Sequence, residues 1–269
     1  MSAMLLLPLA LYFVAAVLSH VHLFTGSAVT RRAATAATLG GVVTHAMVWT
    51  ETIWLGGGAP FRRPSETLSF LAWAIAVAQL VLEARAGWSA VGSLSMPIAF
   101  VALFCALWPA EQSAHAAVIL QSRLMEPHIL ATILGFVSFA LAFCCAILYL
   151  VQSRLLKRKQ LRGLFRRLPP LESMSVSAQW LATAGFSMLS LGIVTGALWA
   201  VHAWKPGWYL DPKVVASGFA WLVYAAYLYA SAVGGWRGRK TTYFLIAGFI
   251  VVLMAYYGVN LVAGGQHLF

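Results

Sequence analysis

A series of long, uninterrupted apolar runs limits this sequence to very few folds. A bilayer core about 30 Å thick is spanned by roughly 20 helical residues. Because the runs do not alternate apolar with polar residues, they predict helices and not barrel strands. Residues 1–269 are therefore expected to form a single all-α, polytopic membrane domain. Its eight transmembrane helices are expected at residues 4–24, 34–55, 68–84, 90–108, 128–151, 176–201, 214–233 and 241–262.

The composition agrees with a membrane protein and leaves no room for a separate soluble domain. Hydrophobic residues make up 61% of the chain and charged residues only 9%, whereas soluble domains carry about 25% charged residues. The three cysteines lie inside apolar runs without CxxC or CxxCH spacing, which predicts packing and no covalent haem attachment. No nucleophile elbow, phosphate loop, zinc motif or paired-carboxylate site is present, so we assign no catalytic residue.

The basic residues predict the orientation of the helices. The net charge is +11, which on a soluble protein would suggest nucleic acid as a partner. Here, however, 13 of the 18 Lys and Arg residues follow the first, third, fifth or seventh apolar run. Because short cytoplasmic loops are enriched in Lys and Arg, these loops are expected to face the cytoplasm. We therefore predict a multi-pass protein of the inner (plasma) membrane, surrounded by lipid, with both termini on the periplasmic side and no nucleic-acid partner.

The loop between the sixth and seventh runs contains an unusual set of aromatic residues. Trp204 and Trp208 precede Asp211, and Pro212 and Lys213 follow it directly. Tryptophan often lies at the membrane interface, which explains some aromatic residues here. It does not explain two tryptophans in a short loop that ends in Asp-Pro-Lys. A flat aromatic platform at the outer surface suits a flat, largely apolar ligand.

This loop resembles the tryptophan-rich signature of the CcsA/HemX-type (YpjD-like) cytochrome c assembly membrane protein family, usually WGxxWxWDPKE. The similarity extends over nearly the whole chain, and residues 120–269 are most like the cytochrome c assembly domain. Lys205, Leu210 and Val214 depart from the usual pattern, which moves the sequence toward the shorter HemX/YpjD branch. The positions that match are Trp204, Trp208, Asp211, Pro212 and Lys213.

The resemblance implies that the chain holds haem b at its periplasmic face in support of cytochrome c biogenesis. Two outer histidines of the family bind the iron, and on this sequence they correspond to His128 and His267. Neutral imidazole is a suitable axial ligand. Trp204, Trp208 and Asp211 would form the platform. The implied partners are haem, an apocytochrome c and a second membrane assembly subunit, and the implied activity is that of a haem lyase (cytochrome c synthase) component. Each histidine taken alone also fits an ordinary residue of the membrane interface.

Two residues inside the apolar runs bear on a second, buried haem. The family's Tyr-Leu-His string ends here in Tyr229, and a neutral phenol is a poor ligand for ferrous iron. We therefore expect no haem in the membrane core, and a packed Tyr229 whose hydroxyl bonds a backbone carbonyl or His45. His45 itself is either a neutral imidazole bonded to a neighbouring helix or a functional group.

Two other functions remain open from the sequence. One is a HemX-like regulatory or scaffolding protein of tetrapyrrole metabolism that does not bind haem. The other is a transporter, which would need a polar path at the middle of the membrane. His45 is the single ionisable candidate that we find there, so the transporter is disfavoured.

Overall fold

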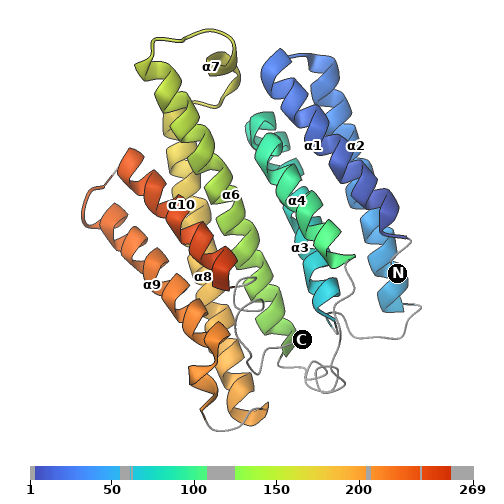
Figure 1. The fold of residues 1–269 in the computed structure, drawn as a ribbon, viewed down its shortest axis with the longest axis vertical. Helices are drawn as coiled ribbons and strands as arrows, with labels where there is room; N and C mark the ends of the chain where they lie inside the picture. Colours follow the sequence, from blue (N-terminus) through green and yellow to red (C-terminus); the bar gives the residue numbers. More distant parts are fainter. Residues whose placement is uncertain are drawn as a thin grey trace. The chain divides into compact units, whose positions relative to one another are not determined.

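The computed structural model describes residues 4–54, 61, 63–107, 125–203, 207–236 and 238–255. Throughout these residues the chain is helical, with short turns and no strand, which confirms the all-α class (Figure 1). The helices are α1 (Leu6–Thr25), α2 (Ala28–Trp54), α3 (Pro64–Ala86), η1 (Ser89–Val91), α4 (Gly92–Ala106), α6 (Met125–Lys157), α7 (Leu164–Arg167), α8 (Leu171–Ala203), η2 (Trp208–Leu210), α9 (Pro212–Ala232) and α10 (Arg239–Leu253).

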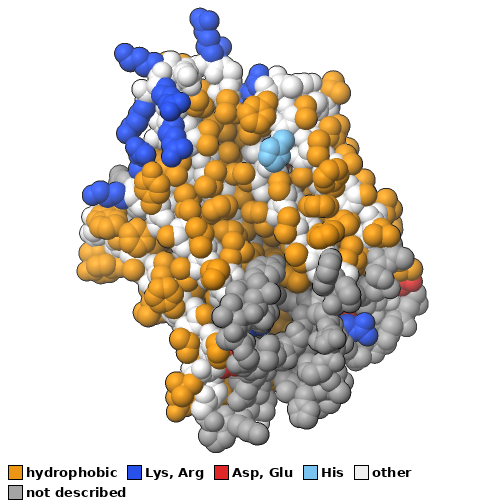
Figure 2. Space-filling model, in the orientation of Figure 1, with side chains coloured by type: hydrophobic (Ala, Val, Ile, Leu, Met, Phe, Trp, Pro, Cys, Tyr) orange, Lys and Arg blue, Asp and Glu red, His pale blue; other side chains and the backbone are white. Residues whose placement is uncertain are grey.

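Six helices in the described part of the chain are long and apolar enough to cross a membrane. They are Leu6–Thr25, Ser65–Ala86, Ser89–Ala106, Met125–Lys157, Leu171–His202 and Pro212–Ala232. The two other expected runs fall on α2, which is less apolar, and on α10, of which 15 residues are described. The protein is thus a multi-pass membrane protein. Its apolar side chains cover much of the face shown in Figure 2, and Lys and Arg side chains gather over α7 and the adjoining end of α6.

The chain divides into two compact units. The first consists of Met1–Ala110 and Leu148–Met174. In this unit α1 packs on α2 and α4, and α3 packs on α2 and α4. The α1 helix ends at Gly26, whose backbone is left-handed with φ of 70°, a conformation that glycine adopts without steric strain. The turn allows α2 to begin two residues later and to return along α1 (Figure 1).

The second unit consists of Glu111–Ile147 and Ser175–Phe269. Aromatic contacts join its helices. Phe139 of α6 stacks on Tyr224 of α9 with ring centroids 3.7 Å apart. Phe249 of α10 lies against Phe143 of α6 at 4.7 Å. Between α8 and α9, the Trp221 indole N–H donates to the Ser190 hydroxyl at 2.9 Å.

The helices extend beyond several of the predicted ends. The α2 helix begins at Ala28, not at residue 34, so Arg31 and Arg32 lie in its first turns and not in a loop. The α8 helix begins at Leu171 and has 33 residues, about 50 Å at 1.5 Å per residue. Hydropathy detects only the part of a helix inside the hydrocarbon core, so the polar ends of these helices were not predicted.

Candidate functional site

His128 lies in the first turn of α6, where it is held by α8. Its Nδ1 is 2.7 Å from the carbonyl oxygen of Gly192. Because a carbonyl oxygen only accepts hydrogen bonds, Nδ1 must carry the hydrogen and donate it. The neutral ring then has its lone pair on Nε2. Among the residues that the structure describes, none bonds to Nε2.

The α8 helix has a glycine at the place where the His128 ring approaches it. A β-carbon added to Gly196 would lie 2.6 Å from His128 Nδ1 and 2.7 Å from Cε1. Gly192, four residues earlier, supplies the carbonyl group that accepts the hydrogen bond. The imidazole is therefore half-buried in a groove on α8, seven residues before that helix ends at Ala203. This separation is about 10 Å along the helix axis.

The aromatic loop that follows α8 presents apolar surface. Trp208, Tyr209 and Leu210 form the short helix η2. Trp208 is half-buried and meets the Tyr209 ring edge to face, with centroids 6.2 Å apart. Tyr209 and Leu210 are exposed. Exposed apolar side chains at this place are able to contact a flat apolar ligand or the lipid interface.

Asp211 has a structural role at the end of the same loop. It is only 7% exposed, and its Oδ1 accepts from the Lys213 backbone N–H at 2.9 Å. This is the hydrogen bond of a helix N-cap, and Pro212 occupies the first position of α9, where a missing N–H does no harm. The Asp-Pro pair therefore ends the aromatic loop and starts α9.

The structure describes three of the five predicted site residues. His128, Trp208 and Asp211 all belong to the second unit. His128 is seated on the last turns of α8, and the loop containing Trp208 follows that helix directly. Trp204 and His267 lie outside the described residues, so their part in the site stays a prediction.

The prediction that Tyr229 is packed and hydrogen-bonded is wrong. Its side chain is 67% exposed and lies in the last turn of α9, which ends at Ala232. Tyrosine near the end of a spanning helix is typical of the membrane interface. His45 is also excluded as its partner, because both imidazole nitrogens of His45 are already bonded.

The first unit contains a separate buried polar cluster around His45. The imidazole is fully buried. Its Nδ1 lies 3.3 Å from the Tyr12 hydroxyl of α1 and its Nε2 lies 2.7 Å from the Ser69 hydroxyl of α3. This confirms the interpretation of His45 as an imidazole bonded between helices. Both nitrogens are occupied, so His45 is not arranged to bind a metal.

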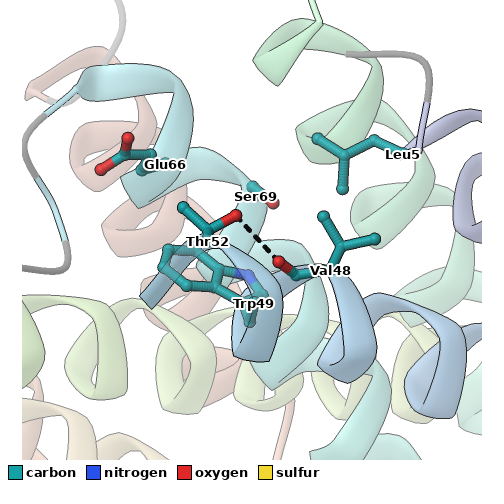
Figure 3. A pocket seen from close by; sticks show the side chains of 6 residues that line it. All are labelled: Leu5, Val48, Trp49, Thr52, Glu66 and Ser69. Carbon is teal, nitrogen blue, oxygen red and sulfur yellow. Dashed lines mark hydrogen bonds between the residues drawn. The ribbon is translucent and has the colours of Figure 1, made fainter. Parts of the chain in front are cut away.

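A small pocket adjoins this cluster (Figure 3). Ser69 lines it together with Glu66, Trp49 and Thr52. The Thr52 hydroxyl donates to the Val48 carbonyl at 2.8 Å, and the Trp49 indole nitrogen is buried without a partner among the described residues. A pocket with space for about one water and several polar groups is a typical site for buried water.

Gly192 and Gly196 are the residues of the site that sequence reasoning missed. They are four residues apart, so they lie on one face of α8. Two glycines at this spacing indicate that another helix or side chain approaches the backbone closely. The spacing was visible in the sequence, but it does not say which residue fills the space.

Comparison with known proteins agrees with this architecture. The family model "Cytochrome C assembly protein" matches residues 63–267. The cytochrome c biogenesis protein CcsA of Thermosynechococcus vestitus is 31% identical over 304 aligned positions, covering 98% of this chain and 93% of that protein. CcsA of Guillardia theta is 31% identical over 236 positions, covering 80% of this chain and 78% of that protein.

A solved structure also matches over nearly the whole chain. The cytochrome c haem lyase CcmF superposes with a TM-score of 0.68 at 17% identity, covering 98% of this chain. The chain spans 46% of the length of that protein, and at this identity the likeness is one of fold. The family match and the near full-length relatives are decisive: the chain belongs to the cytochrome c assembly protein family.

Proposed function

We propose that this protein presents haem b at the periplasmic face of the inner membrane during cytochrome c biogenesis. The observation that carries the proposal is the hydrogen bond from His128 Nδ1 to the Gly192 carbonyl. It leaves the Nε2 lone pair available for iron, and histidine ligands of metals commonly donate their other ring N–H in this way. The cytochrome c biogenesis relatives support the same role.

Each residue of the proposed site has a different role in holding a flat ligand. His128 and His267 would hold the haem iron. Trp204 and Trp208 form the apolar platform beside it. Asp211 holds this platform in place by capping α9. The described members of this set fit haem, because a half-buried imidazole with a free Nε2 is an ordinary haem ligand.

When bound, haem supplies vinyl groups to which the cysteine thiols of an apocytochrome c add to form thioethers. The chain itself binds and orients the porphyrin. We assign its own thiols no part in the reaction, because Cys144 and Cys145 are buried in α6 and the three cysteines have no CxxC spacing. The proposed activity is therefore that of a haem lyase component, with the apocytochrome as substrate.

We further propose one membrane domain with eight spans, both termini in the periplasm, and a second membrane assembly subunit as partner. The charge bias of the loops supports the orientation. The partner is supported by the match to the cytochrome c assembly protein family. The HemX-like regulator is not favoured, since the relatives are named for cytochrome c biogenesis.

An absorption spectrum of the purified protein tests the proposal. We expect a Soret band in the wild type, and a lower haem content in His128→Ala and His267→Ala that added imidazole partly restores. His202→Ala is the matched control, because His202 is exposed and its Nδ1 bonds Leu198 O of its own helix. A wild type without haem, or a double variant with the wild-type spectrum, would contradict the proposal.

A further inference from the structure

We infer that Gly192 and Gly196 are positioning residues that fix the orientation and the tautomer of His128 before haem binds. Their effect on haem rests on the proposed function. Their effect on the tautomer does not, because it follows from contacts between α6 and α8 within the second unit.

Where the two helices meet, each of two side chains on α6 faces one glycine on α8. His128 and Thr132 lie one turn apart on α6, and Gly196 and Gly192 lie one turn apart on α8. A β-carbon on Gly196 would be 2.6 Å from His128 Nδ1, and a β-carbon on Gly192 would be 2.7 Å from Thr132 Cγ2. Either contact is too short to form, so a side chain at either glycine would push α6 away or rotate the opposing residue.

The two glycines act on the imidazole in different ways. Gly196 leaves the space that the ring occupies against α8. Gly192 supplies the oxygen that accepts the Nδ1 hydrogen at 2.7 Å. The Thr195 hydroxyl lies 3.1 Å from the same oxygen, but its shorter bond, at 2.7 Å, goes to the Leu191 carbonyl. A ring in this position is protonated on Nδ1 and offers Nε2.

The hydrogen bond has a consequence for the iron ligand. Donation from Nδ1 increases the basicity of Nε2 and fixes the plane of the ring. A more basic imidazole would favour ferric over ferrous iron, since hydrogen bonds to an iron ligand tune the haem potential. Loss of the groove at Gly196 should weaken haem binding even though His128 remains.

Nitrogen NMR of selectively labelled histidine in the haem-free, full-length protein tests the tautomer directly. His128→Asn identifies the His128 signals by their absence. We expect the wild type to show His128 protonated on Nδ1, and Gly196→Ala to lose that single state. Gly218→Ala is the matched control, because a β-carbon there on α9 meets nothing within 4 Å. A wild-type His128 protonated on Nε2 would overturn the inference, and this measurement needs no glycine variant to fold.

Ligand rescue tests the hydrogen bond in the haem-loaded protein. In His128→Ala, imidazole and 4-methylimidazole are able both to bind iron and to donate to Gly192. By contrast, 1-methylimidazole binds iron but has no N–H. We expect the first two to restore the spectrum at concentrations about tenfold lower, as for one lost hydrogen bond of about 1.4 kcal/mol. Equal concentrations for all three would overturn the role of Gly192.

The two proposals fail in different ways. If the wild type binds no haem but shows the Nδ1 tautomer, the proposed function fails and the positioning role stands. If it binds haem through His128 but Gly196→Ala leaves both the NMR signals and the haem spectrum unchanged, the positioning role fails alone.

Discussion

Arg167 Nη1 donates a hydrogen bond to the Leu23 carbonyl oxygen at 3.2 Å, joining residues 144 positions apart in the sequence. The same nitrogen also bonds the carbonyl of Phe24. These are carbonyls at the C-terminal end of α1, which have no partner within their own helix. A cation at this end also interacts favourably with the helix dipole. One residue of the basic segment after α6, Arg167, therefore caps the C-terminal end of α1.

Arg167→Ala is expected to destabilise the first unit by about 1 kcal/mol, because it removes a charged donor from the end of α1. Arg166→Ala is the matched control. Arg166 is exposed, and its substitution removes one positive charge from the same helix, α7. Thermal unfolding of the two variants in the same detergent checks the difference. Equal melting temperatures would show that only the total charge of the loop matters.

Ser69→Ala is expected to lower the free energy of unfolding by about 1–3 kcal/mol, because it leaves a buried imidazole nitrogen without its partner. The lost bond is the one of 2.7 Å to His45 Nε2. Tyr12→Phe should have a smaller effect, since its bond to Nδ1 is 3.3 Å. Ser138→Ala is the control, because Ser138 is only half-buried and its hydroxyl donates to the Leu134 carbonyl of its own helix. Denaturant titration measures the free energy of unfolding of each variant. An equal loss in Ser138→Ala and Ser69→Ala would contradict the prediction.

Tyr224→Phe is expected to leave stability unchanged or to raise it by up to about 1 kcal/mol. The Tyr224 ring stacks on Phe139, and phenylalanine keeps that contact. The hydroxyl is buried without a hydrogen-bond partner among the described residues, so its removal relieves a desolvated polar group. Melting temperatures of Tyr224→Phe and Tyr12→Phe provide the comparison. A larger loss for Tyr224→Phe would mean that its hydroxyl has a partner, such as bound water.

The helices could be predicted because the bilayer imposes a strong and local signal. Apolar length alone located all the long helices of the described residues, and the Asp211-Pro212 pair marks the start of α9. The polar extensions could not be predicted in the same way. Arg31 and Arg32 interrupt hydropathy, yet they continue a helix, because backbone hydrogen bonding does not require an apolar side chain.

The candidate site was predictable in its residues but not in its contacts. His128 followed from the resemblance, yet the groove at Gly196 depends on how α6 and α8 pack, which is a property of two distant segments. Tyr229 was misjudged for the same reason. Its sequence position suggested membrane depth, whereas the end of α9 at Ala232 decides its place. Which face of a helix is buried is a tertiary property that a uniformly apolar helix does not encode.

Tyr229→Phe is accordingly expected to change neither stability nor haem content, because an exposed side chain gives up no buried hydrogen bond. Alanine variants compare the buried face of α9 with its exposed face. Tyr227 is only 3% exposed, so Tyr227→Ala should lower the free energy of unfolding by about 3 kcal/mol or more. Tyr229→Ala should lower it by less than about 1 kcal/mol. Thermal unfolding and the haem-to-protein ratio are the measurements. Loss of a spectroscopic component in Tyr229→Phe would place a haem at this residue.

Reporter fusions are expected to show the loop containing Phe165 in the cytoplasm, and both Gly207 and the C-terminus at Phe269 in the periplasm. The physical reason is the seven Lys and Arg residues between Arg154 and Arg167, since basic loops close to spanning helices are retained on the cytoplasmic side. A reporter active only in the periplasm should be active after Gly207 and Phe269 and silent after Phe165. A reporter active only in the cytoplasm should show the reverse. The fusion at Phe269 has the greatest consequence, because a cytoplasmic C-terminus would require an odd number of spans after a periplasmic N-terminus. His267 would then be on the opposite side of the membrane from the loop at Trp208, and it could not share one haem with His128.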